Sequence, residues 1–155
     1  MLAGCGFATA DAVPDLALRG PIPVPPDVRE TRVGRVVDGD TVSLRGLGSA
    51  RVIGVDTPEV HGAQECYGSE ASAFARRMLR RGARVRYVPG EERRDRYGRP
   101  LVYLWLADGR SFNAMLAEGG YARTLTIAPT DRYAALLGRF ERQARRHERG
   151  RWTAC

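Results

Sequence analysis

The sequence predicts an α+β fold in which a small five-stranded β-barrel of the OB type carries about three helices on its outside. Five short runs rich in β-branched and apolar residues are separated by turn signals, and a helical pattern is inserted between the third and fourth runs. Two further helical patterns follow the fifth run. A chain of 155 residues has the size of one ordinary domain.

The strands are expected, in chain order, at 31–37, 40–46, 50–56, 83–88 and 101–107. Asp38 and Gly39 give a strong hairpin signal between the first two, because both residues accept the backbone angles of a tight turn. Pro58 ends the third strand, since proline has no N–H to donate to a ladder. A polar loop over 89–100 separates the last two strands.

The helices are expected at 69–81, 112–118 and 131–149, where apolar residues recur at a helical period. Gly82 ends the first helix, and an extended piece at 121–127 precedes the last one. The arginines of the last helix lie largely off its apolar face. Such a face is typical of solvated surface, and a docking surface is the alternative.

Residues 1–28 are expected to form a Pro-rich tether, and 29–155 the domain, because five of the nine prolines lie in the first segment. All 25 basic residues are arginine, and the net charge of +7 divides into −2 for the tether and +9 for the domain. A field of that sign attracts nucleic acid or an anionic membrane surface, or serves solubility alone. No apolar stretch approaches the ~20 residues of a membrane span, which argues against a transmembrane protein.

Three cysteines, Cys5, Cys66 and Cys155, lack the spacing of a metal site. The residues before Cys5 resemble the lipobox of bacterial lipoproteins, in which the cysteine carries a membrane-anchoring lipid. Only four residues precede it, so either the start lies further upstream or the match is chance. In an exported protein of the periplasm, cell envelope or medium, Cys66 and Cys155 could form a disulfide, whereas in a reducing cytoplasm both would be free thiols.

In so basic a chain, the clustered acids are the unusual groups. Asp38, Asp40, Asp56 and Glu59 lie at strand ends or in the turns beside them. If the second and third strands are antiparallel neighbours, Asp40 and Asp56 meet at one rim of the barrel. Two carboxylates without His or Cys ligands favour Ca²⁺ or Mg²⁺. The alternative is that each acid caps its own turn.

Two arginines favour the metal. Arg51 precedes Asp56 by five residues, on the opposite face of the strand by parity if the strand is regular, and Arg99 lies in the loop before the fifth strand. A cation and two guanidinium groups can clamp the charge of a phosphoryl transition state. Glu59 could then orient or deprotonate a water. The alternatives are a cross-strand ion pair for Arg51 and a surface charge for Arg99.

Four stretches carry a resemblance to a known family by their order and spacing: 37–41, 51–59, 67–72 and 95–99. From about Val33 to Trp152, the chain resembles the staphylococcal nuclease (thermonuclease) family of calcium-dependent phosphodiesterases. The resemblance implies an OB barrel with helices, Ca²⁺ as the cofactor, and DNA and RNA as partners. It further implies cleavage at the 5′ P–O bond that leaves 3′-phosphate ends.

The resemblance also implies a role for each matching residue. Asp40 and Asp56 match the calcium carboxylates, Thr57 the backbone carbonyl ligand, and Asp38 an outer-sphere acid near the ion. Glu59 matches the residue that acts on the attacking water.

Four more residues match the family's phosphate-binding groups. Arg51 and Arg99 match the arginines that bind the phosphate and stabilise its transition state, and Arg96 and Tyr97 match positions that contact a terminal phosphate. The chain departs from the family in its short 60–66 loop and in the absence of tyrosines over 124–128.

The leading hypothesis is therefore a calcium-dependent, sugar-nonspecific endonuclease. We expect a preference for single strands, because a splayed backbone reaches a rim site more easily than a duplex does. Nothing in the sequence demands more than a monomer. One alternative is a noncatalytic OB module that binds nucleic acid, and another is an envelope-anchored domain whose arginine-rich helix binds anionic lipid.

Overall fold

The structure, a computed structural model, describes residues 18–155, and Cys5 with its expected lipid lies outside these residues. The described strands are β1 (Arg29–Val36), β2 (Thr41–Leu44), β3 (Gly48–Val52), β4 (Gly54–Asp56), β5 (Arg84–Arg94), β6 (Pro100–Leu106) and β7 (Arg123–Leu125). The described helices are α1 (Gly68–Met78), α2 (Phe112–Glu118), α3 (Ala134–Arg146) and α4 (Arg151–Ala154).

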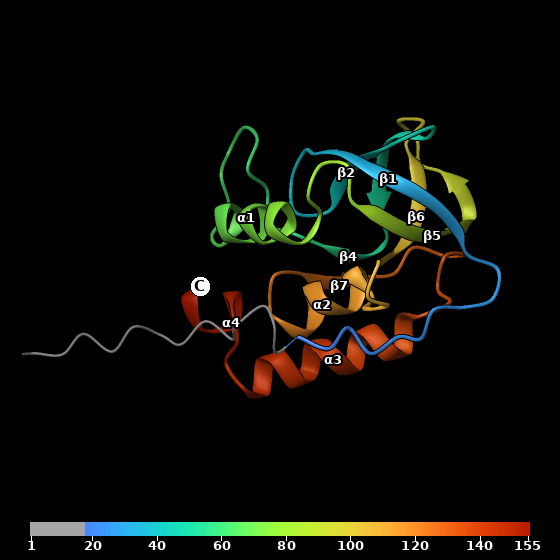
Figure 1. Ribbon diagram of the computed structural model, residues 1–155. Helices are drawn as coiled ribbons and strands as arrows, with labels where there is room; N and C mark the ends of the chain where they lie inside the picture. Colours follow the sequence, from blue (N-terminus) through green and yellow to red (C-terminus); the bar gives the residue numbers. More distant parts are fainter. Residues whose placement is uncertain (1–17) are drawn as a thin grey trace, which may run out of the picture.

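Five strands close into a barrel in the order β1-β2-β3-β6-β5, which confirms the predicted α+β fold. Only the β3–β6 pair among these is parallel. Figure 1 shows α2 and α3 layered below the barrel and α1 beside it, with β4 and β7 between the barrel and the helices. One buried core joins these layers and includes Trp105, Phe74, Phe112 and Leu137.

The run 50–56, expected to be one strand, is divided at Gly54. This glycine has φ +79°, and a Cβ placed on it would lie 2.6 Å from Leu137 Cδ1. The chain therefore turns out of the barrel here, and β4 pairs with β7 so that Asp56 lies opposite Arg123. The extended piece expected at 121–127 supplies that partner strand.

Other boundaries also differ from the expectation. Strand β5 runs on to Arg94, because Pro89 lies opposite Val102 and the ladder continues past a register shift. The polar loop expected over 89–100 is correspondingly shorter. Helices α1 and α3 end earlier than expected, and the one-turn helix α4, which the sequence did not predict, ends the chain.

The segment 18–28, expected to belong to the tether, packs against the domain. The side chains of Leu18 and Ile22 are 1% and 2% exposed. Glu118 Oε2 accepts hydrogen bonds from Arg19 N and Gly20 N, both at 3.0 Å, and Trp105 Nε1 donates to Ile22 O at 2.8 Å. The boundary expected at residue 29 is thus wrong, because these residues complete the core. Among residues 18–155, no helix has both the length and the apolar character needed to span a membrane.

Candidate active site

The barrel brings together the carboxylates and the arginine that the sequence singled out. Strands β2 and β3 are antiparallel, and Thr41 lies opposite Arg51. Arg51 Nη2 lies 3.3 Å from Asp40 Oδ2 and 3.2 Å from Asp56 Oδ1, so a single nitrogen contacts both acids. Opposite faces are expected for Arg51 and Asp56 only in a regular strand, and the strand is not regular: the turn at Gly54 returns Asp56 to the side of Arg51.

Arg51 is held in this position by main-chain oxygens. Its Nη1 donates to Val52 O and, at 3.1 Å, to Val55 O. These carbonyls flank the turn at Gly54, so the turn that moves Asp56 also fixes the guanidinium between the two acids.

Asp40 is buried, with 6% of its surface exposed. Its Oδ2 accepts hydrogen bonds from Thr57 N at 2.8 Å and from Thr57 Oγ1 at 2.9 Å. Asp38 Oδ1 accepts from Asp40 N at 3.1 Å, which places Asp38 beside the pair and not in it. Burial raises the pKa of Asp40 to about 6, because desolvation outweighs the attraction of Arg51.

The donor set at this rim fits a hard divalent cation. Asp40 and Asp56 could supply carboxylate oxygens and Thr57 a main-chain oxygen, and such ligands suit Ca²⁺. The guanidinium of Arg51 does not fully offset the cost of burying the Asp40 carboxylate. A second positive charge nearby, such as a cation, would therefore stabilise its ionised form. Within residues 18–155, no three His, Cys, Asp or Glu side chains form a cluster that could hold an ion. An ion here would thus complete its shell with water or substrate oxygens.

The second predicted arginine is held by a tight turn between β5 and β6. Arg99 Nε donates to Asp95 Oδ2 at 2.7 Å, while Asp95 Oδ1 accepts from the backbone N–H groups of Arg99 and Tyr97, both at 2.9 Å. These bonds outweigh the effect of burial and lower the pKa of Asp95. Arg99 Nη1 lies 3.5 Å from Thr41 Oγ1, which places it beside the start of β2.

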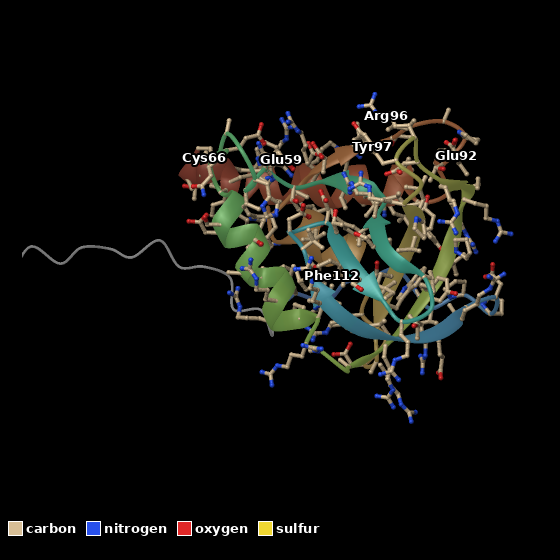
Figure 2. All side chains as sticks on the ribbon, turned by 90° about the horizontal axis from the view of Figure 1, so that it is seen from above. Glu59, Cys66, Glu92, Arg96, Tyr97 and Phe112 are labelled. Atoms are coloured by element: carbon tan, nitrogen blue, oxygen red, sulfur yellow. A yellow bond between two sulfur atoms is a disulfide. The ribbon has the colours of Figure 1, made fainter. Side chains whose placement is uncertain are left out.

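A groove of about 590 Å³ lies beside Arg51. Arg96 and Arg99 line it, together with the exposed apolar side chains of Tyr97, Leu125 and Ile127, of which Tyr97 is 68% exposed. Arg96 Nη2 donates to the Tyr97 hydroxyl at 2.7 Å. Figure 2 shows Arg96 and Tyr97 projecting together from the molecule, so both are available to a ligand.

Glu59 lies in the loop between β4 and α1, on the same side of the molecule as Tyr97 in Figure 2. Its side chain is exposed, and among the described residues its carboxylate makes no hydrogen bond or ion pair. The backbone of Glu59 is held instead, since its N–H donates to Glu65 Oε2 at 2.9 Å. The carboxylate is therefore free to contact water.

Cys66 and Cys155 are joined by a disulfide, the pairing that the sequence left open. It links the Glu59 loop to the end of α4. His61, at the other side of the same loop, lies 3.3 Å from Val37 O through its Nε2.

Sequence reasoning missed two residues that contact side chains of the predicted site. Arg123 Nε lies 3.6 Å from Asp56 Oδ2, because β7 pairs with β4. No local pattern marks Arg123, since its place depends on a strand pairing. Asp95 is the first residue of the 95–99 stretch, and its spacing to Gly98 is typical of an aspartate that forms a turn. This spacing could have identified Asp95 as the partner of Arg99.

Comparison with known proteins gives one consistent result. The family model described as "Staphylococcal nuclease homologue" matches residues 49–154. The chain is 38% identical over 126 residues to the thermonuclease of Staphylococcus intermedius, covering 77% of this chain and 74% of that protein. It is 37% identical over 128 residues to the thermonuclease of Staphylococcus hyicus, covering 79% and 75%.

A third relative is much longer. The chain is 34% identical over 132 residues to Endonuclease YhcR of Bacillus subtilis, which covers 76% of this chain but 11% of that protein. The family model matches more than half of the chain, and each thermonuclease relative is covered over about three quarters of its length. Both findings agree with the closed barrel. The chain belongs to the staphylococcal nuclease family.

Proposed function

We propose that the protein is a nuclease that hydrolyses phosphodiester bonds of DNA and RNA. The observation that carries this proposal is the contact of one guanidinium, that of Arg51, with both Asp40 and Asp56 at the edge of an arginine-lined groove. Acids that could hold a cation and arginines that could bind a phosphate thus lie side by side. Membership of the family and the names of the relatives, thermonuclease and endonuclease, support the same activity.

Asp40, Asp56 and the carbonyl of Thr57 would hold Ca²⁺, the ion that best suits a set of oxygen ligands of mixed type. When bound, the ion neutralises charge that develops on the phosphate. With the two acids holding the ion, Arg51 Nη2 would be released from them and would donate to an incoming phosphate, while Nη1 keeps its bonds to the carbonyls of Val52 and Val55. Asp38, which accepts from the backbone N–H of Asp40, would be an outer-sphere acid near the ion.

The protein's own groups carry the remaining chemistry. Arg51 and Arg99 donate hydrogen bonds to the phosphate oxygens, and these bonds strengthen as negative charge develops. Glu59 orients a water and takes one of its protons as the water oxygen bonds to phosphorus. The bond from phosphorus to the 5′ oxygen breaks, and this oxygen takes up a proton from solvent water, while Glu59 returns its proton to solvent. The products therefore carry a 3′-phosphate and a 5′-hydroxyl. Arg96 and Tyr97 would hold the neighbouring phosphate at the groove.

The same site bears on strand preference. The groove lies at a barrel rim and has apolar side chains, Leu125 and Ile127, where a base could pack after it leaves a duplex. This supports single-stranded nucleic acid as the preferred substrate. We infer that the enzyme acts as a monomer in an oxidising compartment outside the cytoplasm, and the disulfide supports this location.

Digestion of heat-denatured DNA tests the proposal. The wild-type protein and Glu59→Gln are each incubated with Ca²⁺ and with a chelator. We expect calcium-dependent cleavage that falls by at least about two orders of magnitude in Glu59→Gln, the scale of losing a general base. Glu70→Gln, the same change at an exposed glutamate in the first turn of α1, is the matched control and should cleave normally.

One outcome would overturn the nuclease proposal, and a second would overturn the role of Glu59. Retarded but uncut DNA under both conditions would indicate a noncatalytic binding module. Equal rates for Glu59→Gln and Glu70→Gln would exclude Glu59 from the reaction. Product ends are identified by labelling with polynucleotide kinase, which accepts a 5′-hydroxyl directly.

A further inference from the structure

The loop that carries Glu59 has few interactions of its own. Residues 61–66 are all exposed. Its internal bonds are a reciprocal pair, in which Glu59 N donates to Glu65 Oε2 and Glu65 N donates to Glu59 O, both at 2.9 Å. The bond from Gly68 N to Glu65 O, at 3.1 Å, then joins the loop to the start of α1. A short exposed loop with so few bonds opens easily on its own.

The loop is closely packed against α1 at one point. A Cβ placed on Gly68 would lie 2.5 Å from Glu59 O, so the helix start lies directly against the Glu59 backbone. A shift of the chain between Glu65 and Gly68 would therefore also move the Glu59 backbone. Cys66 lies in this stretch, between Glu65 and Gly68.

The disulfide fixes that part of the loop to a firm support. Cys155 ends α4, and α4 is anchored by the bond from Arg151 N to Gly120 O, at 2.9 Å. The backbones of Gly150 and Gly120 approach so closely that a Cβ on Gly150 would lie 2.5 Å from Gly120 O. Arg145 lies over the Trp152 ring, with its Cζ 4.0 Å from the ring centre. The crosslink thus ties the exposed loop to the end of α2 and to α3.

We propose that Cys66 and Cys155 are positioning residues for Glu59: the crosslink holds the loop so that the Glu59 carboxylate is presented to the attacking water. This inference rests on the nuclease function proposed above. When a dithiol reduces the bond, two thiols form, the dithiol becomes a disulfide, and the loop loses its tie to α4. Both cysteines are exposed, so such a reagent can reach them.

We expect reduction of the crosslink to lower turnover and to leave substrate binding unchanged. The phosphate-binding side chains Arg51, Arg96 and Arg99 lie on β3 and on the β5–β6 turn, which make no bond to the crosslink. Misplacing a catalytic group by about 1 Å can lower a rate on the order of a hundredfold. We therefore expect kcat to fall by about ten- to a hundredfold on reduction, with KM within about twofold.

The experiment compares the full-length protein, oxidised and reduced, with Cys66→Ser/Cys155→Ser. Cys5→Ser is the matched control, since it makes the same substitution at the cysteine outside the crosslink and should respond to the dithiol as the wild type does. Rates are measured well below the melting temperature of every form, so a loss of stability alone leaves kcat unchanged. Reoxidation of the reduced wild type should restore its rate.

A second arm separates positioning of Glu59 from any other effect. In Glu59→Gln, reduction should lower the small remaining rate by less than about twofold, because the group being positioned is already absent. A loss as large as in the wild type would overturn the proposal, as would an unchanged kcat in Cys66→Ser/Cys155→Ser.

Hydrogen exchange gives a readout that needs no activity. The amides of Glu59, Glu65 and Gly68 should exchange at least about fivefold faster after reduction, whereas the amide of Thr57, which donates to Asp40, should not change. If the oxidised wild type fails to cleave DNA, the proposed function fails, and this measurement still decides whether the crosslink holds the loop. Unchanged exchange at all three amides would refute that.

Discussion

Replacement of Asp95 by Asn separates the two tasks of this side chain. Oδ1 accepts two backbone hydrogen bonds, from Tyr97 N and Arg99 N, and Oδ2 accepts the bond from Arg99 Nε. An Asn side chain keeps one oxygen for the backbone bonds, but its amide group cannot accept from the guanidinium. We therefore expect Asp95→Asn to keep the turn and release Arg99, whereas Asp95→Ala loses both.

The size of the effect follows from these contacts. The Asp95–Arg99 pair is partly exposed, with side-chain exposures of 18% and 33%, so its loss should cost about 1 kcal/mol of stability and lower the melting temperature by about 3 °C. Catalysis should suffer more, because an unheld Arg99 meets the phosphate in many orientations. A loss in kcat/KM of about tenfold, equal to about 1.4 kcal/mol, is expected.

The pH dependence provides a check on the cause. Because the folded protein lowers the pKa of Asp95, its stabilisation is complete above the ordinary aspartate pKa of about 3.9 and is lost as the pH falls through the folded value. Thermal melts should thus separate wild type from Asp95→Asn at pH 7 and converge in acid. Equal kcat/KM for wild type and Asp95→Asn on denatured DNA would refute the positioning of Arg99 by Asp95.

Two further predictions concern acids elsewhere. Asp40→Asn should weaken Ca²⁺ binding by at least about tenfold, because one of two carboxylate charges is lost; calorimetry with a nucleotide analogue present measures this. Asp108→Asn, the same change at an exposed surface aspartate, should leave Ca²⁺ binding unchanged. Glu141→Gln should lower the free energy of unfolding by about 1–3 kcal/mol at pH 7, because Glu141 accepts from Thr124 and pairs with Arg145 at 2.6 Å. These contacts outweigh burial and lower the pKa of Glu141. Its stabilisation should therefore be complete above the ordinary glutamate pKa of about 4.3 and be lost only below it, as the pH falls through the lower folded value. Denaturation repeated from pH 7 into acid should show the difference between wild type and Glu141→Gln shrinking below that point, and a constant difference would contradict this.

The barrel could be predicted because its strands carry local signals. The turn at Asp38 and Gly39 and the β-branched runs on either side of it fix the first hairpin without reference to the rest of the chain. The division of 50–56 into β3 and β4 could not be predicted in this way. Its cause is contact with Leu137 on α3, far away in sequence, and a glycine inside an apolar run reads equally well as part of one strand.

In the candidate site, too, the features with local sequence signals could be predicted, and those that depend on long-range contacts could not. Asp40 and Asp56 could be placed at one rim from strand order alone, and their meeting at Arg51 agrees with that prediction. The partners that adjust the site depend on tertiary structure. Arg123 reaches Asp56 only through the pairing of β7 with β4, and the segment 18–28 completes the core although its prolines favour an extended tether.

The packed segment 18–28 decides where the protein can be cut. Proteases need an exposed and extended stretch of chain, and Leu18 and Ile22 are buried while Gly20 is hydrogen bonded to Glu118. Cleavage between Leu18 and Ile22 should therefore be slow, and mass spectrometry of a limited digest would show fragments that keep these residues. A fragment that starts at Arg29 would leave the indole N–H of Trp105 without its acceptor and expose the part of the core that Leu18 and Ile22 cover, and it should aggregate.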